Sequence, residues 1–129
     1  MFDKIKKLTI GEQEYSFKMT NKTILKIDEK YGNYGTVLQG IMEGIQFYTN
    51  ALKLISCSCI DKEYETINDK KIEKTKEFSV EELADLLTPQ QLNCEIAGFA
   101  TELYFDYMGI KDNKTDKETK KTKSKTEKN

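Results

Sequence analysis

The sequence predicts a mainly helical α+β domain, in which a short N-terminal β-hairpin packs on a bundle of about four helices and a disordered Lys-rich tail follows. Three observations carry this prediction. Apolar residues alternate near the N-terminus, they recur at helical spacing further along, and they are absent from residues 111–129. We therefore expect a single folded domain over residues 1–110 and a disordered charged tail over residues 111–129.

The N-terminal hairpin is predicted from alternating polarity. Leu8 and Ile10 alternate with polar neighbours, residues 11–14 supply a turn, and Tyr15 and Phe17 resume the alternation. Only one face of this hairpin is apolar, and a lone hairpin is marginally stable in water. We therefore expect its apolar face to pack on the helices that follow.

The next segment predicts a helix of about three turns. It begins after the N-cap signal Thr20-Asn21 and stops at Gly32. The apolar positions of this helix are Ile24, Leu25, Ile27 and Tyr31. Residues 32–35 are then expected to form a loop.

The strongest periodic signal is a heptad-like apolar seam. Its members alternate at spacings of 3 and 4: Leu38, Ile41, Ile45, Tyr48, Leu52, Ile55 and Cys59. The seam predicts one long helix from Thr36 to Cys59, and further apolar residues beside it place this helix in the middle of the bundle. Gly40 and Gly44 lie one turn apart on it. They suit either a close approach of another backbone or a bend in the helix.

The C-terminal half begins with an exposed excursion over the mostly charged residues 61–77, either a short hairpin or a mobile loop. Ser79 and Glu82 then form a capping box that begins a short helix. Pro89 stands at the first position of the last helix. That helix carries one apolar stripe, made of Leu92, Ile96, Phe99, Leu103, Tyr107 and Ile110.

The end of this last helix is apolar on more than one side, because Tyr104, Phe105 and Met108 fall off its main stripe. Such a surface is covered either by the core of the domain or by a protein partner. We propose as protein-binding candidates the aromatic and apolar residues of this end: Phe99, Leu103, Tyr104, Phe105, Tyr107 and Met108.

Missing residue types argue against catalysis. The chain of 129 residues has 21 Lys but neither His nor Arg, so it lacks the usual general base near pH 7 and the bidentate phosphate clamp. No phosphate-binding loop, dinucleotide-binding or calcium-loop motif is present. We therefore expect no enzyme activity, no cofactor and no metal site.

The three cysteines, Cys57, Cys59 and Cys94, are an odd number without a C-x-x-C pair. A disulfide framework is not expected, and buried thiols are the better interpretation. If Cys57 and Cys59 lie on a helix, their side chains point about 200° apart and cannot chelate one ion together.

Charge and hydropathy bear on location and partners. Every uncharged stretch is far shorter than the ~20 apolar residues of a membrane-spanning helix. The first seven residues carry charge where a signal peptide is apolar, so we expect a cytoplasmic protein.

The distribution of charge bears on nucleic-acid binding. Residues 1–110 have 13 Lys against 18 acidic residues, whereas the tail has 8 Lys against 4 acidic residues and no aromatic residue. Nucleic-acid binding is therefore not expected.

The order of elements resembles a known family. A short hairpin over Leu8–Phe17, a helix over Ile24–Gly32, a helical body and a charged tail together resemble the tail assembly chaperones of long-tailed phages and prophages of low-G+C bacteria. The recognisable part covers about the first 35 residues. The resemblance implies a non-catalytic protein of the host cytoplasm. It would bind the tape measure protein as its client, recruit the major tail protein and not remain in the finished virion. Self-association of several copies along this helical client would add avidity to such a role.

Two other functions are weighed against this one. The chain could instead be a minor structural virion protein, such as a tail-completion or connector protein, which would be found in purified particles. It could also be a small regulatory protein that binds nucleic acid through its basic tail, in which case binding would depend steeply on salt.

Overall fold

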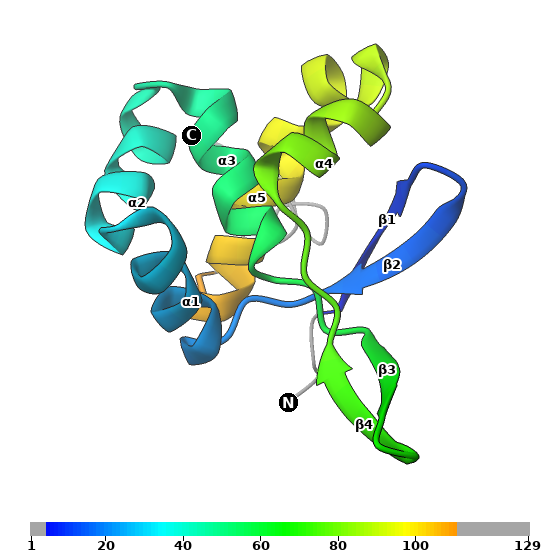
Figure 1. The fold of residues 1–129 in the computed structure, drawn as a ribbon. Helices are drawn as coiled ribbons and strands as arrows, with labels where there is room; N and C mark the ends of the chain where they lie inside the picture. The colour runs from blue at the N-terminus through cyan, green and yellow to red at the C-terminus, as the bar shows by residue number, and fades with distance from the viewer. Residues whose placement is uncertain (1–4, 111–129) are drawn as a thin grey trace, which may run out of the picture.

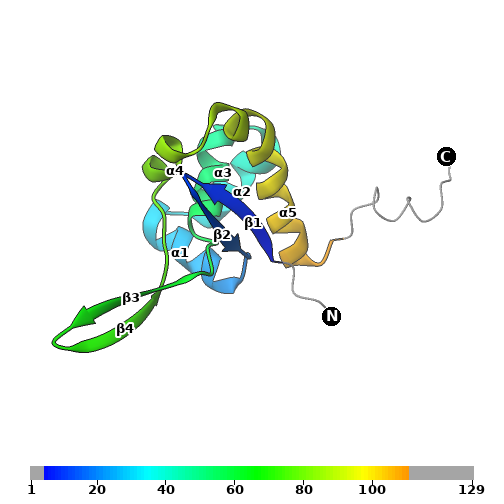
Figure 2. The ribbon, with the colours of Figure 1, turned by 90° about the vertical axis from the view of Figure 1, so that its right-hand side faces the viewer.

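The computed structural model describes residues 5–110, which fold into five α-helices, one π-helical turn and two β-hairpins (Figure 1). The mainly helical α+β class is confirmed. The helices gather on one side, and the first hairpin lies against them (Figures 1 and 2). The predicted tail over residues 111–129 lies outside the described residues.

The predicted N-terminal hairpin is present as strands β1 (Lys6–Ile10) and β2 (Gln13–Phe17). They pair antiparallel with Ile10 opposite Gln13, so the turn contains two residues rather than the four that the sequence indicated. Gly11 opens the turn at a φ of +70°, a conformation that glycine adopts without steric cost. As expected, Leu8, Ile10 and Phe17 are buried against the helices.

The second edge of β2 is also covered. The backbone N–H of Lys18 donates to the carbonyl of Ser58 at 2.9 Å, and that of Ile60 donates to Ser16 at 2.9 Å. Phe17 and Cys59 form the bridge between these two bonds. Both edges of β2 are thus hydrogen bonded at its C-terminal end, which stabilises a hairpin that would be marginal by itself.

Helix α1 (Asn21–Tyr31) begins and ends where the sequence predicts. The Thr20 and Thr23 side chains form a reciprocal capping box, and Gly32 ends the helix at a φ of +102°. The following loop is shorter than expected. Asn33 accepts a hydrogen bond from the N–H of Gly35 at 2.7 Å and thereby caps the next helix.

The predicted long helix from Thr36 to Cys59 is wrong. The chain forms two helices here, α2 (Tyr34–Glu43) and α3 (Phe47–Ser56), which pack against each other. Gly44 adopts a left-handed φ of +75° and Gln46 a φ of +47°, so the helix stops and the chain turns back. The apolar seam continues across this turn without interruption, which is why its spacing did not reveal the break.

The two glycines of the predicted helix have different roles. Gly44 ends α2, as just described. Gly40 allows a close approach: a Cβ built there would lie 2.0 Å from Asn50 Nδ2 and 2.6 Å from the carbonyl oxygen of Ile45. Asn50 Nδ2 donates to that carbonyl at 2.8 Å, and Asn50 is 6% exposed. This contact, the Gly40–Asn50 clasp, fixes the α2–α3 turn.

Helix α3 is central to the core, as expected for the middle of the seam. It contacts α1, α2, α4 and α5, and most of its residues from 50 to 56 are buried. The buried apolar residues of the domain include Leu8, Phe17, Ile27, Val37, Ile41, Leu52, Leu54, Ile55, Phe78, Leu83, Ile96, Ala100 and Leu103.

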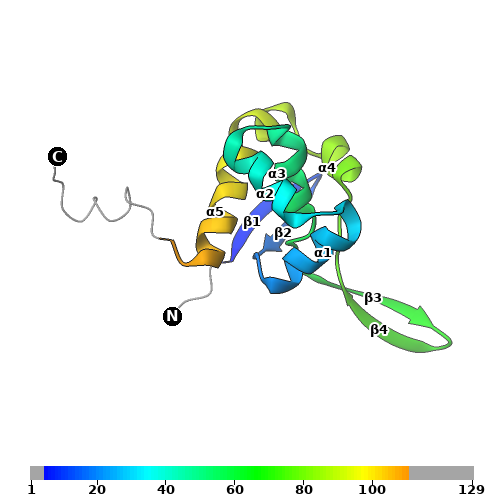
Figure 3. The ribbon, with the colours of Figure 1, turned by 90° about the vertical axis from the view of Figure 1, so that its left-hand side faces the viewer.

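Of the two possibilities for residues 61–77, the hairpin is observed. Strands β3 (Lys62–Ile67) and β4 (Lys70–Thr75) pair antiparallel through a two-residue turn. This hairpin extends away from the helices (Figures 2 and 3), and its strand residues are almost all exposed. Because its charged side chains remain in water, the hairpin does not have to be buried against the helices.

The last helices follow the predicted capping signals. In α4 (Val80–Leu86), the N–H of Glu82 donates to Ser79 Oγ at 3.0 Å and the N–H of Ser79 donates back to the Glu82 carboxylate at 2.9 Å. A π-helical turn (Gln91–Glu95) then leads into α5 (Ile96–Met108). Gly109 ends α5 at a φ of +74°.

Candidate protein-binding surface

The six predicted protein-binding residues lie on α5, and the structure divides them into two groups. Leu103 is 1% exposed, and the ring of Phe99 meets that of Phe17 edge-on with centroids 5.6 Å apart. These two side chains pack in or against the core of the domain. Leu103 therefore cannot take part in a binding surface, because the hairpin and α3 cover this side of α5.

The other four residues remain near the surface at the C-terminal end of α5. Tyr104, Phe105 and Tyr107 are half-buried, and Met108 is 52% exposed. The ring centroids of Tyr104 and Phe105 lie 6.2 Å apart, with the two rings tilted relative to each other. Large aromatic side chains held in place with one face in water are typical of protein contact sites.

A third tyrosine, which sequence reasoning missed, completes this group. Tyr34 opens α2, and its burial raises its pKa to about 12, with a further contribution from Tyr104 and Tyr107 nearby. The hydroxyl of Tyr107 donates to Asn21 Oδ1 at the start of α1. We call Tyr34, Tyr104, Phe105, Tyr107 and Met108 the α5-end surface. Tyr34 belongs to no periodic apolar pattern in the sequence, because it lies between Gly32 and Gly35 in a predicted loop.

A second apolar surface lies at the turn between α2 and α3. Met42, Ile45 and Tyr48 are 59%, 54% and 45% exposed. The seam assigned two of them to a buried helix face, but the turn at Gly44 carries them outward. These residues are aliphatic for the most part and lie around a turn, whereas the α5-end surface is aromatic and lies on a helix.

A small basic pocket lies between α1 and the base of the second hairpin. It has a volume of about 180 Å³, and its lining includes Lys18, Lys22, Lys26 and Lys62. Lys62 Nζ donates to Thr75 Oγ1 at 3.2 Å, and Lys26 lies 3.6 Å from the Glu77 carboxylate. The carboxylate of Glu77 compensates part of the positive charge of Lys26, whereas the neutral Thr75 hydroxyl leaves the charge of Lys62 unchanged.

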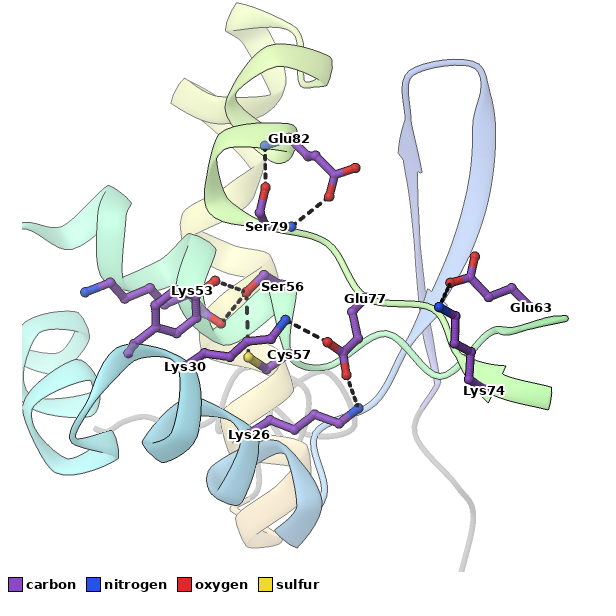
Figure 4. A network of polar contacts seen from close by, with 11 residues as sticks. Lys26, Lys30, Lys53, Ser56, Cys57, Glu63, Lys74, Glu77, Ser79 and Glu82 are labelled. Atoms are coloured by element: carbon purple, nitrogen blue, oxygen red, sulfur yellow. Dashed lines mark hydrogen bonds and ion pairs between the residues drawn. The ribbon is translucent and has the colours of Figure 1, made fainter. Parts of the chain in front are cut away.

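Glu77 links the second hairpin to α1. Its carboxylate lies between Lys26 and Lys30, at 3.6 Å and 2.7 Å (Figure 4). The hydrogen bond from Lys30 lowers the pKa of Glu77, and the positive charges of both lysines add to this shift. The contact is partly exposed and fixes the base of the hairpin rather than forming a reactive centre.

The cysteines do not form a site together. Cys57 and Cys59 are buried, as expected, but they follow α3 instead of lying on a helix, and burial raises the pKa of both thiols. Cys94 is exposed in the π-helical turn, against the expectation of a buried thiol. Within residues 5–110, no group of three His, Cys, Asp or Glu side chains could hold a metal ion.

Comparisons of the chain with protein-family models, with curated proteins and with solved structures find no match. Among the described helices, none is long and apolar enough to cross a lipid bilayer.

Proposed function

We propose that this protein is a non-catalytic tail assembly chaperone of a long-tailed phage or prophage, which binds the tape measure protein and recruits tail-tube subunits in the host cytoplasm. The resemblance of the N-terminal hairpin and first helix supports this proposal. The single structural observation that supports it most is the α5-end surface, which offers aromatic side chains but no reactive group.

The chemistry of that surface suits a helical client. An amphipathic helix binds through apolar side chains spaced three or four residues apart, and rigid aromatic rings give such contacts area at a low entropic cost. Tyr107 is held by Asn21 and Tyr34 is half-buried beside α5, so part of the surface is ordered before a client arrives. A client with many similar turns would bind several copies at once, which adds avidity to individually weak contacts.

The test is a pull-down from cells in which the parent phage is replicating, with bound proteins identified by mass spectrometry. We expect the wild type to recover a very long, helix-rich protein and to be absent from purified particles. The pair Tyr104→Ser and Phe105→Ser should lose this client. The matched control pair, Met42→Ser and Ile45→Ser, removes exposed apolar groups elsewhere and should retain it. Equal recovery by both pairs would exclude the α5-end surface.

Thermal unfolding followed by circular dichroism checks that these variants are folded. This check is needed because Tyr104 and Phe105 are half-buried, so their replacement can also lower stability. Both pairs must remain folded at the temperature of the pull-down. Recovery of the protein in purified particles would favour the minor virion component instead.

The basic pocket favours a second candidate, a small nucleic-acid-binding protein. Its lysines would neutralise phosphates, and affinity would then fall steeply with salt. A shift of labelled DNA that weakens in Lys22→Gln and disappears above physiological salt would support this candidate. No shift at low salt would exclude it.

A further inference from the structure

The β3–β4 hairpin is a two-stranded sheet without a third strand in the described part of the chain. It projects from the helices (Figures 1 and 2), and Tyr64, Ile67 and Ile72 on it are 56%, 46% and 42% exposed. Isolated two-stranded hairpins are marginally stable, and an exposed strand edge is a template for another strand. The hairpin therefore has the properties of a docking element.

The register shows which backbone groups point outward. Asn68 and Asp69 form a two-residue turn with φ values of 52° and 66°, typical of a type I′ turn, so the flanking Ile67 and Lys70 form a hydrogen-bonded pair. Hydrogen-bonded and non-hydrogen-bonded pairs alternate from there. On β4, the N–H and C=O groups of alternate residues therefore face away from β3. These residues are Lys71, Glu73 and Thr75.

Lysines on an edge strand normally discourage pairing. A second copy of β4, brought up antiparallel across a two-fold axis, meets one of them, Lys71, with the opposite charge in one register. With Ile72 on the axis, each Lys71 stands opposite Glu73 of the second copy, and the two Ile72 side chains face each other. Such opposite-charge and apolar cross-strand pairs stabilise a sheet.

Neighbouring registers lack this complementarity. Shifting β4 against its copy places Lys71, Glu73 or Lys74 opposite itself. The central registers of β3 against β3 place Glu63 or Glu65 opposite an acidic residue. The favoured register does bring Lys74 opposite Lys70 of the second copy.

The charge of Lys74 is already compensated within its own hairpin. Its Nζ lies 4.0 Å from the Glu63 carboxylate and 2.8 Å from that of Glu65. The Lys70–Lys74 approach in the favoured register therefore costs little.

We propose that β4 is a homodimerisation edge, which pairs antiparallel with β4 of a second copy around Ile72. The product is a four-stranded sheet with the order β3-β4-β4-β3. About four backbone hydrogen bonds form across the axis, so the contact is small and the dimer is weak. This inference is independent of the chaperone proposal, because it involves neither the α5-end surface nor a client.

Cysteine cross-linking tests the register. In a Cys94→Ser background, Ile72→Cys places two thiols opposite each other in a non-hydrogen-bonded pair, within disulfide reach. The matched control is Tyr64→Cys, which carries an exposed thiol on the outer strand. We expect Ile72→Cys to form a disulfide-linked dimer under mild oxidation at least tenfold faster than the control. Equal rates would overturn the proposal.

Sedimentation at increasing concentration tests the pairing itself. Lys71→Glu and Glu73→Lys should each weaken the dimer about tenfold, and the double variant should restore it. Glu73→Pro removes an outward N–H that β3 does not use, so it should abolish dimerisation, whereas Tyr64→Pro on the other edge should not. A wild type that stays monomeric at millimolar concentration, or a double variant without recovery, would refute the inference. Circular dichroism confirms that each variant is folded.

Discussion

Replacing Gly40 by alanine tests the Gly40–Asn50 clasp. Alanine normally stabilises a helix interior relative to glycine by about 1 kcal/mol. Here the new methyl group would lie 2.0 Å from Asn50 Nδ2 and 2.6 Å from the backbone oxygen of Ile45. The amide can move only by giving up its hydrogen bond to that oxygen, and the backbone oxygen cannot move without shifting the α2–α3 turn.

The expected cost follows from these contacts. Breaking a buried side-chain hydrogen bond and leaving its groups unsatisfied costs ~1–3 kcal/mol. Forcing an extra methyl group into a packed site costs a further ~1–3 kcal/mol. After subtraction of the helix-propensity gain, Gly40→Ala should lower the free energy of unfolding by about 3 kcal/mol. For a domain of this size, the melting temperature should fall by about 10–20 °C.

Urea unfolding followed by circular dichroism measures this change, and Gly98→Ala is the matched control. Gly98 also lies inside a helix, but a Cβ there meets no atom within 4 Å. That substitution should stabilise the protein by up to ~1 kcal/mol. In an Asn50→Ala background, Gly40→Ala should cost less than in the wild type. A neutral Gly40→Ala, or an equal cost in both backgrounds, would refute the steric explanation.

Three further predictions concern single side chains. Ser79→Ala removes the cap of α4 and should cost ~0.5–2 kcal/mol of unfolding free energy in the same urea assay. In the native protein, Cys94 alone should react with a thiol reagent, and the buried Cys57 and Cys59 should react only after urea is added. Rapid reaction of all three thiols without urea would contradict the burial of Cys57 and Cys59. The pKa of Glu77 is lowered in the folded state, so its stabilisation is present above the unfolded pKa and is lost as pH falls through the lower folded value. Glu77→Gln should therefore reduce stability slightly at pH 7 but not at pH 2, and a difference that persists at pH 2 would contradict the ion pair with Lys30.

The elements that the sequence predicted correctly are those with local signals. The alternation around Leu8 and Phe17 identified the first hairpin, and the capping chemistry at Thr20 and Ser79 marked two helix starts. Such signals act between residues a few positions apart, so they do not depend on the rest of the fold. Gly32 and Gly109 likewise ended helices where they stand.

The prediction of one long helix was wrong because apolar periodicity shows which face of a helix is buried, not whether the helix is continuous. The residues on both sides of Gly44 keep the same spacing, since α2 and α3 each bury one face in the same core. The only local sign of the turn is Gly44 itself, which favours a left-handed helix end. A glycine inside an apolar helix is equally compatible with a close approach, and Gly40 is an example of that.

The candidate site was predicted in part. The sequence showed that the end of α5 is apolar on several sides, but not which side the domain covers. That depends on Phe17, which is 82 positions earlier than Phe99 and meets it only in the fold. For the same reason, Tyr34 could not be assigned to the surface before α2 was seen to begin beside α5.

Contacts between the first and last elements determine when this chain can finish folding during its synthesis. Gln91 Nε2 donates to the carbonyl of Thr9 at 2.7 Å, and Lys6 pairs with Glu102 at 2.6 Å. The first hairpin therefore lacks its final cover until α5 has left the ribosome, and its apolar face is exposed while the middle of the protein is made. Contacts between residues far apart in the sequence slow folding. A ribosome that pauses within α5 would therefore leave an incomplete nascent chain with exposed apolar residues, which is prone to aggregate.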